Sequence, residues 1–246
     1  MSDDPFRHLP HLRERVTPPI QSALRPTAEV MAIWDASARA AGRPADWRLP
    51  DAAIEASRRA VLGGRDGSQD LWVFAYGSLM WDPGLHFAEV RLAELDGFAR
   101  RFALRSPIGR GTPERPALML CLEPGPGRCT GLAYRIAADL AEAESAILWR
   151  REMLRGSYRP QLHQATTPQG AVEVLVLAAN PSHDDHADEQ PLAETAATIA
   201  CATGILGSNR HYLEQLAAQL AALGIVDDYV EQLHRCVQLQ ADGPPG

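Results

Sequence analysis

The sequence predicts an α+β protein, in which a curved sheet or small mixed barrel forms the core and helices surround it. From Leu71 onward, short apolar runs of strand length alternate with Gly, Pro and Asp. One helical pattern interrupts these runs and three follow them, so strands and helices are largely segregated along the chain. The length of 246 residues fits one large domain or two small ones.

Residues 1–69 are expected to form a helical extension ahead of a core domain of residues 70–246. Apolar residues recur at helical spacing over Val30–Ala38 and again over Ile54–Leu62. Asp51 precedes the second pattern, and we expect its carboxylate to cap that helix. The Gly-rich stretch that follows is predicted to be a linker or exposed loop.

The core domain is predicted to contain seven strands and four helices. The strands are short apolar runs bounded by turn residues: Leu71–Ala75, Val90–Leu95, Ala99–Leu104, Ala117–Glu123, Cys129–Ile136, Tyr158–Ala165 and Val172–Ala179. The helices have apolar residues every three or four positions: 138–153, Leu192–Ala202, Arg210–Leu223 and Asp227–Leu239.

The charge composition excludes several classes of function. The chain has 24 basic and 31 acidic side chains, a net charge of −7, which argues against a nucleic-acid partner. All the basic side chains are Arg, and Lys is absent. A Lys Schiff base, pyridoxal-phosphate catalysis through an internal aldimine and a Walker-type phosphate loop are therefore excluded, because each needs a Lys.

Cysteine spacing and hydropathy favour a soluble, cytoplasmic protein. Cys121, Cys129, Cys201 and Cys236 form no C-x-x-C pair, and four thiols in a chain this long do not make a disulfide scaffold. The most apolar run, Ala171–Ala179, is far shorter than the ~20 residues that cross a bilayer. The first residues show no apolar region typical of a secretory signal, so no membrane partner is expected.

A segment that follows the first predicted core strand is the first candidate site. It consists of Tyr76, Gly77, Ser78, Leu79, Met80 and Trp81. Gly77 permits a special backbone conformation in which successive amides point at one anionic group. The same residues also fit a plain tight turn with buried aromatic side chains, and the pattern alone favours neither interpretation.

The second candidate is Glu152, near the end of the predicted helix 138–153. It is expected on the inward-facing side of the helix, with Leu140, Glu144, Ile147 and Leu148. Burial and the negative end of the helix dipole both disfavour the charged carboxylate, which raises its pKa toward the range useful for proton transfer. A neighbouring arginine would oppose this shift by pairing with it; the candidates are Arg150, Arg151 and Arg155. The pattern alone favours the interpretation of Glu152 as an ordinary salt-bridged residue near a helix end.

The common catalytic and metal-binding motifs are missing. There is no G-x-S-x-G, H-E-x-x-H or G-x-G-x-x-G sequence. His183 and His186 lie among carboxylates, but no third His is near, so we expect a solvated loop rather than a metal site. No metal or organic cofactor is expected.

Five short motifs follow one another through the core domain. They are Tyr76–Trp81, Arg110–Glu114, Gly131–Arg135, Trp149–Met153 and Gly204–Leu213. Each is weak alone, but in this order they resemble the ChaC-type γ-glutamylcyclotransferases. The resemblance covers Leu71 to about Leu223 and leaves the N-terminal extension outside.

The resemblance implies a γ-glutamylcyclotransferase-like barrel that cleaves glutathione into 5-oxoproline and Cys-Gly without a cofactor. It assigns the catalytic proton transfers to Glu152 and the binding of the γ-glutamyl group to Tyr76–Trp81. Tyr158 matches an aromatic position after the catalytic helix. Arg110 and Arg135 are candidate partners for a substrate carboxylate, although each fits a structural ion pair equally well.

Three other functions remain open from the sequence. In the first, the protein is a cyclotransferase whose substrate is another γ-glutamyl amino acid or amine. In the second, the core is a non-catalytic regulatory module of the same fold. Alternatively the helices of the extension dock a partner, which is compatible with enzymatic activity.

Overall fold

The computed structural model describes residues 4–40 and 42–241. They fall into two compact units. The first unit comprises residues 1–96 and 130–178, and the second comprises 97–129 and 179–246. The predicted extension therefore belongs to the same unit as the first core strand.

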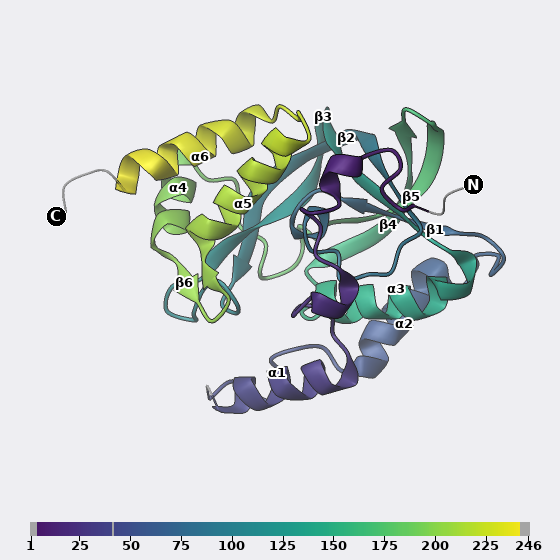
Figure 1. Cartoon of the computed structure of the whole chain (residues 1–246). Helices are drawn as coiled ribbons and strands as arrows, with labels where there is room; N and C mark the ends of the chain where they lie inside the picture. Colours follow the sequence, from purple (N-terminus) through teal and green to yellow (C-terminus); the bar gives the residue numbers. More distant parts are fainter. Residues whose placement is uncertain (1–3, 41, 242–246) are drawn as a thin grey trace. The chain divides into compact units, whose positions relative to one another are not determined.

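Five strands form a closed barrel in the order β1-β3-β2-β4-β5 (Figure 1). They are β1 (Leu71–Ala75), β2 (Glu89–Ser106), β3 (Ala117–Ile136), β4 (Tyr158–Thr167) and β5 (Gly170–Ala179). β1 pairs with β3 antiparallel and with β5 in parallel, so the sheet is mixed. The predicted α+β class with a small mixed barrel is confirmed.

Two of the strands are longer than the sequence predicts. Val90–Leu95 and Ala99–Leu104 are parts of β2, and Ala117–Glu123 and Cys129–Ile136 are parts of β3. Gly97, predicted to lie between two strands, takes φ +79° within β2. A glycine in this conformation lets a strand bend without leaving the sheet. Gly97 is therefore part of one continuous strand and does not end it.

The first unit contains three α-helices: α1 (Ala28–Ala40), α2 (Asp51–Leu62) and α3 (Ala138–Glu152). α2 lies beside α3 (Figure 1). Arg58 of α2 donates to Glu142 at 2.9 Å and to Ser145 at 3.0 Å. The capping role predicted for Asp51 is wrong. Pro50 holds the cap position, and the Asp51 carboxylate accepts a hydrogen bond from Arg48 at 2.7 Å.

Three short 3₁₀ helices also lie in the first unit: η1 (Pro10–Leu12), η2 (Pro19–Gln21) and η3 (Ser78–Met80). The core of this unit is centred on β1, where Val73, Phe74 and Ala75 have no exposed surface. η3 follows this buried strand after two residues, so its start is held by the barrel.

In the second unit, α4 (Leu192–Cys201), α5 (Asn209–Ala222) and α6 (Asp228–Ala241) pack on one another (Figure 1). A short hairpin of β6 (Thr203–Gly204) and β7 (Gly207–Ser208), which the sequence did not predict, connects α4 to α5. Asn209, in the last resembling motif, is fully buried and bonds both the amide and the carbonyl of Leu118. That motif therefore has a clear packing role within this unit.

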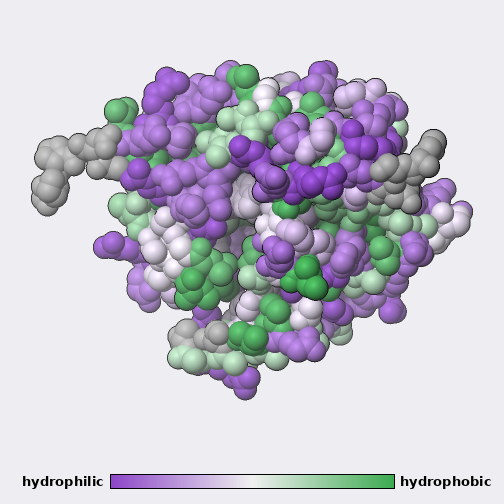
Figure 2. Space-filling model, viewed as in Figure 1, coloured by the Kyte–Doolittle hydropathy of each residue, from purple (hydrophilic) through white to green (hydrophobic). Residues whose placement is uncertain are grey.

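On the face shown in Figure 2, hydrophilic residues predominate and hydrophobic ones lie in small groups among them. Among the described residues, no helix is both long and apolar enough to cross a membrane.

Candidate active site

α3 carries Glu152 as its last residue. The buried residues of this helix are Glu144, Ser145, Leu148 and Trp149. Leu140 is 40% exposed, so its predicted inward position is wrong. The predicted inward positions of Glu144 and Leu148 are confirmed, and Trp149 beside them is 1% exposed.

The Glu152 side chain is largely withdrawn from water, with 16% of its surface exposed. Burial raises the pKa of this carboxyl, and the Arg151 guanidinium opposes the rise through its charge and its hydrogen bond. Nε of Arg151 lies 2.9 Å from Glu152 Oε1. The charge of Asp82 raises the pKa further, so the net direction is upward.

Arg151 joins the end of α3 to the predicted substrate loop. Its Nη1 donates to the carbonyl of Asp82 at 2.6 Å and its Nη2 to Ser78 Oγ at 3.3 Å. The sequence named Arg151 only as one of three possible partners for Glu152. In the fold, its side chain is 7% exposed and holds the carboxylate and the loop together.

The loop itself is a tight turn around η3. The amide of Met80 donates to Gly77 O at 2.8 Å, and that of Asp82 donates to Ser78 O at 2.9 Å. The amides of Ser78 and Leu79, at the start of the turn, take no part in these bonds. Gly77 has φ −134° and ψ −132°, so the turn does not use the left-handed conformation that favours glycine.

Some of the predicted loop residues anchor the turn in the first unit. The Tyr76 hydroxyl donates to Leu177 O at 2.8 Å. Met80 is fully buried, and its carbonyl accepts from the Tyr134 hydroxyl at 3.3 Å. Trp81 is half-buried, and Tyr158, also half-buried, begins β4.

Asp82 is a residue of this region that the sequence interpretation missed, because Asp82-Pro83-Gly84 has the composition of an ordinary turn. Its Oδ1 is buried and has no hydrogen-bond partner in the described part of the chain. The nearest cation is Arg151, whose Nη1 lies 3.9 Å from this oxygen. A buried carboxylate oxygen without a donor is unusual. The position of Asp82 beside Glu152 contributes to the raised pKa of Glu152.

Asp82→Asn is expected to lower the pKa of Glu152, because it removes a charge that raises it. A carboxylate that acts as a base must be ionised, so the acidic limb of the kcat/KM profile should move to lower pH. Activity measured from pH 5 to 9 tests this, with Asp139→Asn, at an exposed position in the first turn of α3, as the control. An acidic limb that stays in place, or moves to higher pH, contradicts the assigned effect of Asp82 on the pKa of Glu152.

The two arginines proposed as carboxylate partners differ in their surroundings. Arg135 pairs with Asp70 at 2.7 Å and with Glu89 at 3.0 Å, which is the structural ion pair considered above. Arg110, in the second unit, donates to Ser208 O at 3.0 Å and lies over the Tyr212 ring. Burial lowers the pKa of Arg110. Its role as a carboxylate partner stays a prediction.

The two histidines of the loop after β5 have separate partners. His186 Nε2 lies 2.7 Å from Glu123, and His183 Nδ1 accepts a hydrogen bond from the amide of Asp185. Within the ranges that the structure covers, no three His, Cys, Asp or Glu side chains gather as metal ligands would.

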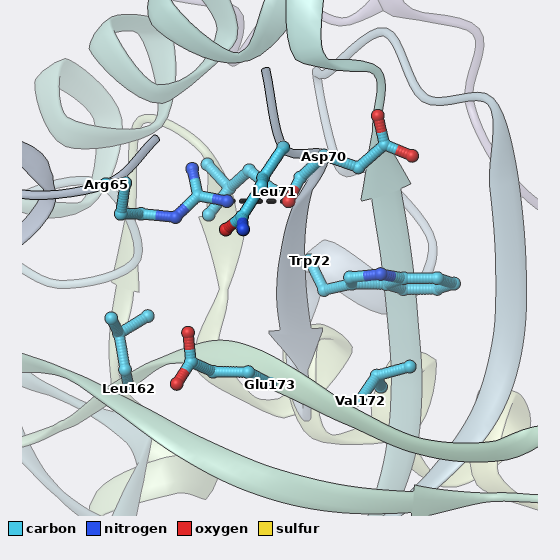
Figure 3. Close-up of a pocket in the computed structure, with 8 residues that line it drawn as sticks. Arg65, Asp70, Leu71, Trp72, Leu162, Val172 and Glu173 are labelled. Carbon is cyan, nitrogen blue, oxygen red and sulfur yellow. Dashed lines mark hydrogen bonds between the residues drawn. The ribbon is translucent and has the colours of Figure 1, made fainter. Parts of the chain in front are cut away.

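Figure 3 shows a pocket of about 320 Å³ at the start of β1. It is lined by Arg65, Gln69, Asp70, Leu71, Trp72, Leu162, Val172 and Glu173. The Arg65 guanidinium donates to the backbone carbonyl of Asp70 at 2.6 Å. None of the lining residues is one of the predicted site residues, so this pocket does not define the candidate active site.

Comparisons with known proteins identify the family. The family model described as ChaC-like protein matches residues 71–240. The chain is 40% identical over 179 residues to the glutathione-specific gamma-glutamylcyclotransferase of Escherichia coli (strain K12), covering 72% of this chain and 77% of that protein. It is 34% identical to gamma-glutamylcyclotransferase 2-1 of Arabidopsis thaliana, covering 71% of this chain and 85% of the relative.

A solved structure supports the fold independently. The crystal structure of the yeast γ-glutamylcyclotransferase specific to glutathione superimposes with a TM-score of 0.64 at 24% identity. The match covers 69% of this chain and 96% of the yeast chain.

Proposed function

The chain belongs to the ChaC-like family, and from this premise we propose that it is a glutathione-specific γ-glutamylcyclotransferase. The observation that carries the proposal is Glu152, a largely buried carboxyl with a raised pKa, tied by Arg151 to the turn at Ser78. Glutathione is the proposed substrate because relatives of this chain are named as specific for it. The proposed products are 5-oxoproline and Cys-Gly.

The reaction needs no protein nucleophile, because the substrate contains its own. The α-nitrogen of the γ-glutamyl unit attacks the δ-carbonyl carbon, and a five-membered ring forms as this C–N bond closes. The bond between the δ-carbon and the cysteinyl nitrogen then breaks. Holding the substrate in a folded conformer supplies much of the acceleration, since the two reacting groups are already in one molecule.

Glu152 is proposed to move the proton that this exchange requires. As the ring closes, the neutral α-amine must lose a proton, and the departing cysteinyl nitrogen must gain one. A carboxylate with a raised pKa can accept the first proton and donate it to the leaving nitrogen. The protein is thus returned to its starting state without a metal, cofactor or water.

The start of η3 is proposed to bind negative charge in the substrate. The amides of Ser78 and Leu79 are not engaged within the turn and can donate to an anion. Two substrate groups suit them: the α-carboxylate of the γ-glutamyl unit and the oxyanion that develops on the δ-carbonyl. We assign a supporting role in this turn to Tyr76, Met80 and Trp81, because their hydrogen bonds anchor it.

Incubation of the purified full chain with glutathione and, separately, with γ-Glu-Ala tests the proposal when 5-oxoproline is measured by mass spectrometry. Product from glutathione alone, above an enzyme-free control, is the expected result. Product from γ-Glu-Ala alone keeps the mechanism and changes the substrate to another γ-glutamyl compound. No product from either substrate overturns the proposed activity and favours the non-catalytic module.

Ser78→Ala is expected to reduce kcat/KM by only about three- to tenfold. The hydroxyl accepts a 3.3 Å bond from Arg151, whereas the binding of the substrate anion is assigned to backbone amides that the substitution keeps. Steady-state kinetics with glutathione measure the effect. Complete loss of activity in a folded variant would instead support a serine nucleophile.

A cytoplasmic location is proposed with this activity. The four cysteines are free thiols, as expected in a reducing compartment.

A further inference from the structure

The N-terminal extension precedes the residues that match the family model, 71–240, yet it contacts the candidate active site directly. The amide of Thr17 donates to the carbonyl of Trp81 at 2.8 Å. The amide of Leu49 donates at 2.7 Å to the carbonyl of Leu154, two residues beyond Glu152. Both ends of the site, the substrate turn and the end of α3, are therefore bonded to the extension.

Arg25 makes the most complete of these contacts. Its Nη1 and Nη2 lie 2.7 and 2.8 Å from the two carboxylate oxygens of Glu144, on the buried face of α3. The same Nη1 donates to Gly84 O at 2.6 Å. Glu144 in turn accepts a 3.0 Å bond from the amide of His86. One ion pair thus ties the extension, α3 and the backbone that follows the substrate turn.

Gly84 shows how closely these parts meet. Its φ of +60° is one that side chains disfavour. A Cβ atom there would lie 3.2 Å from Ser22 Oγ and 3.3 Å from Nη1 of Arg151. Arg151 donates to the carbonyl of Asp82, two residues earlier. Gly84 is consequently bonded to Arg25 and lies close to Arg151, the arginine that pairs with Glu152.

We propose that the extension is a working part of the active site, with Arg25 as a positioning residue that fixes the segment Asp82–His86 against α3 and thereby holds the Arg151–Glu152 pair in place. The kinetic consequence rests on the proposed function. The bidentate pairing matters, because a planar guanidinium fixes the direction of a carboxylate in a way that an ammonium does not.

A second ion pair of the extension provides a matched control. Arg58, on α2, is 4% exposed and donates to Glu142, two residues before Glu144 on α3. It also docks the extension on α3, but its side chain bonds Glu55, Glu142 and Ser145, none of them in the substrate turn. Loss of Arg58 therefore weakens docking alone, whereas loss of Arg25 also releases the segment Asp82–His86 from α3.

The first arm of the test is steady-state kinetics with glutathione. We expect Arg25→Gln to lower kcat by about 10- to 100-fold with a change in KM below about threefold, because it displaces the groups that move the proton. Arg25→Lys should stay impaired, and Arg58→Gln should remain within about twofold of the unchanged protein. Since Arg25→Gln leaves Glu144 buried and unpaired, the double variant Arg25→Gln/Glu144→Gln is included and should show the same kcat defect.

The second arm is hydrogen exchange by mass spectrometry on the full-length variants. The amides of Met80, Asp82 and His86 should exchange faster in Arg25→Gln than in Arg58→Gln, since all three are bonded within the turn or to Glu144. This arm needs no activity, so it decides the positioning claim even if the unchanged protein makes no 5-oxoproline. Equal effects of Arg25→Gln and Arg58→Gln, or none from Arg25→Gln, overturn the proposal.

Discussion

Glu152→Gln is expected to reduce the turnover of glutathione by roughly 10²- to 10⁴-fold, the usual range for loss of a general acid–base group. The amide has nearly the size and shape of the carboxyl but cannot accept the proton from the α-amino group. Because the group is buried beside Arg151, the substitution removes a charge without opening a cavity. KM should change little. Initial rates of 5-oxoproline formation at saturating glutathione measure the effect.

Glu142→Gln is the control for this variant. Glu142 lies on the same helix, but its side chain is 82% exposed, so its activity should stay close to that of the unchanged protein. A thermal unfolding curve for each variant separates a folding defect from a chemical one. If Glu152→Gln retains activity within tenfold while folded, Glu152 does not have the assigned role.

Arg151→Gln is expected to lower kcat/KM by about 10- to 100-fold. The guanidinium bonds the Asp82 carbonyl at 2.6 Å and Ser78 Oγ at 3.3 Å, so its removal releases the substrate turn. The Arg151 charge also lowers the pKa of Glu152, so the loss of Arg151 should move the acidic limb of the kcat/KM profile to higher pH. Asp82→Asn should move the same limb in the opposite direction.

Arg150→Gln is the matched control, since Arg150 is exposed and adjacent in sequence. Its profile from pH 5 to 9 should overlay that of the unchanged protein. If the Arg151→Gln profile shifts to lower pH, or drops in height without any shift, Arg151 does not lower the pKa of Glu152 as assigned.

Much of the fold was predictable because secondary structure follows short-range spacing. β1 occupies the predicted residues, and α3 ends within one residue of the predicted boundary. The errors have tertiary causes. Leu140 shares the helical spacing of the buried Glu144 and Leu148, yet it is 40% exposed in the folded chain. Asp51 has the residue type of a cap, but Arg48 takes its carboxylate.

The candidate site was predictable only in part. Glu152 and the Tyr76–Trp81 segment followed from their position beside apolar patterns and from the resemblance to a family. Arg151 was one of three arginines between which local spacing does not discriminate. Asp82 carried no signal, because its buried oxygen is a consequence of how the turn packs.

Local patterns were thus sufficient for the class of fold and the order of most elements, since these depend on residues within a few positions of one another, whereas the carboxyl group assigned to proton transfer also needed the resemblance to a family. The environment of that carboxyl required the folded chain. Arg25 and Glu144 are 119 residues apart, and their pairing depends on how the extension and α3 meet. The pKa of Glu152 likewise depends on burial and on Asp82, a charge that only the tertiary structure brings near.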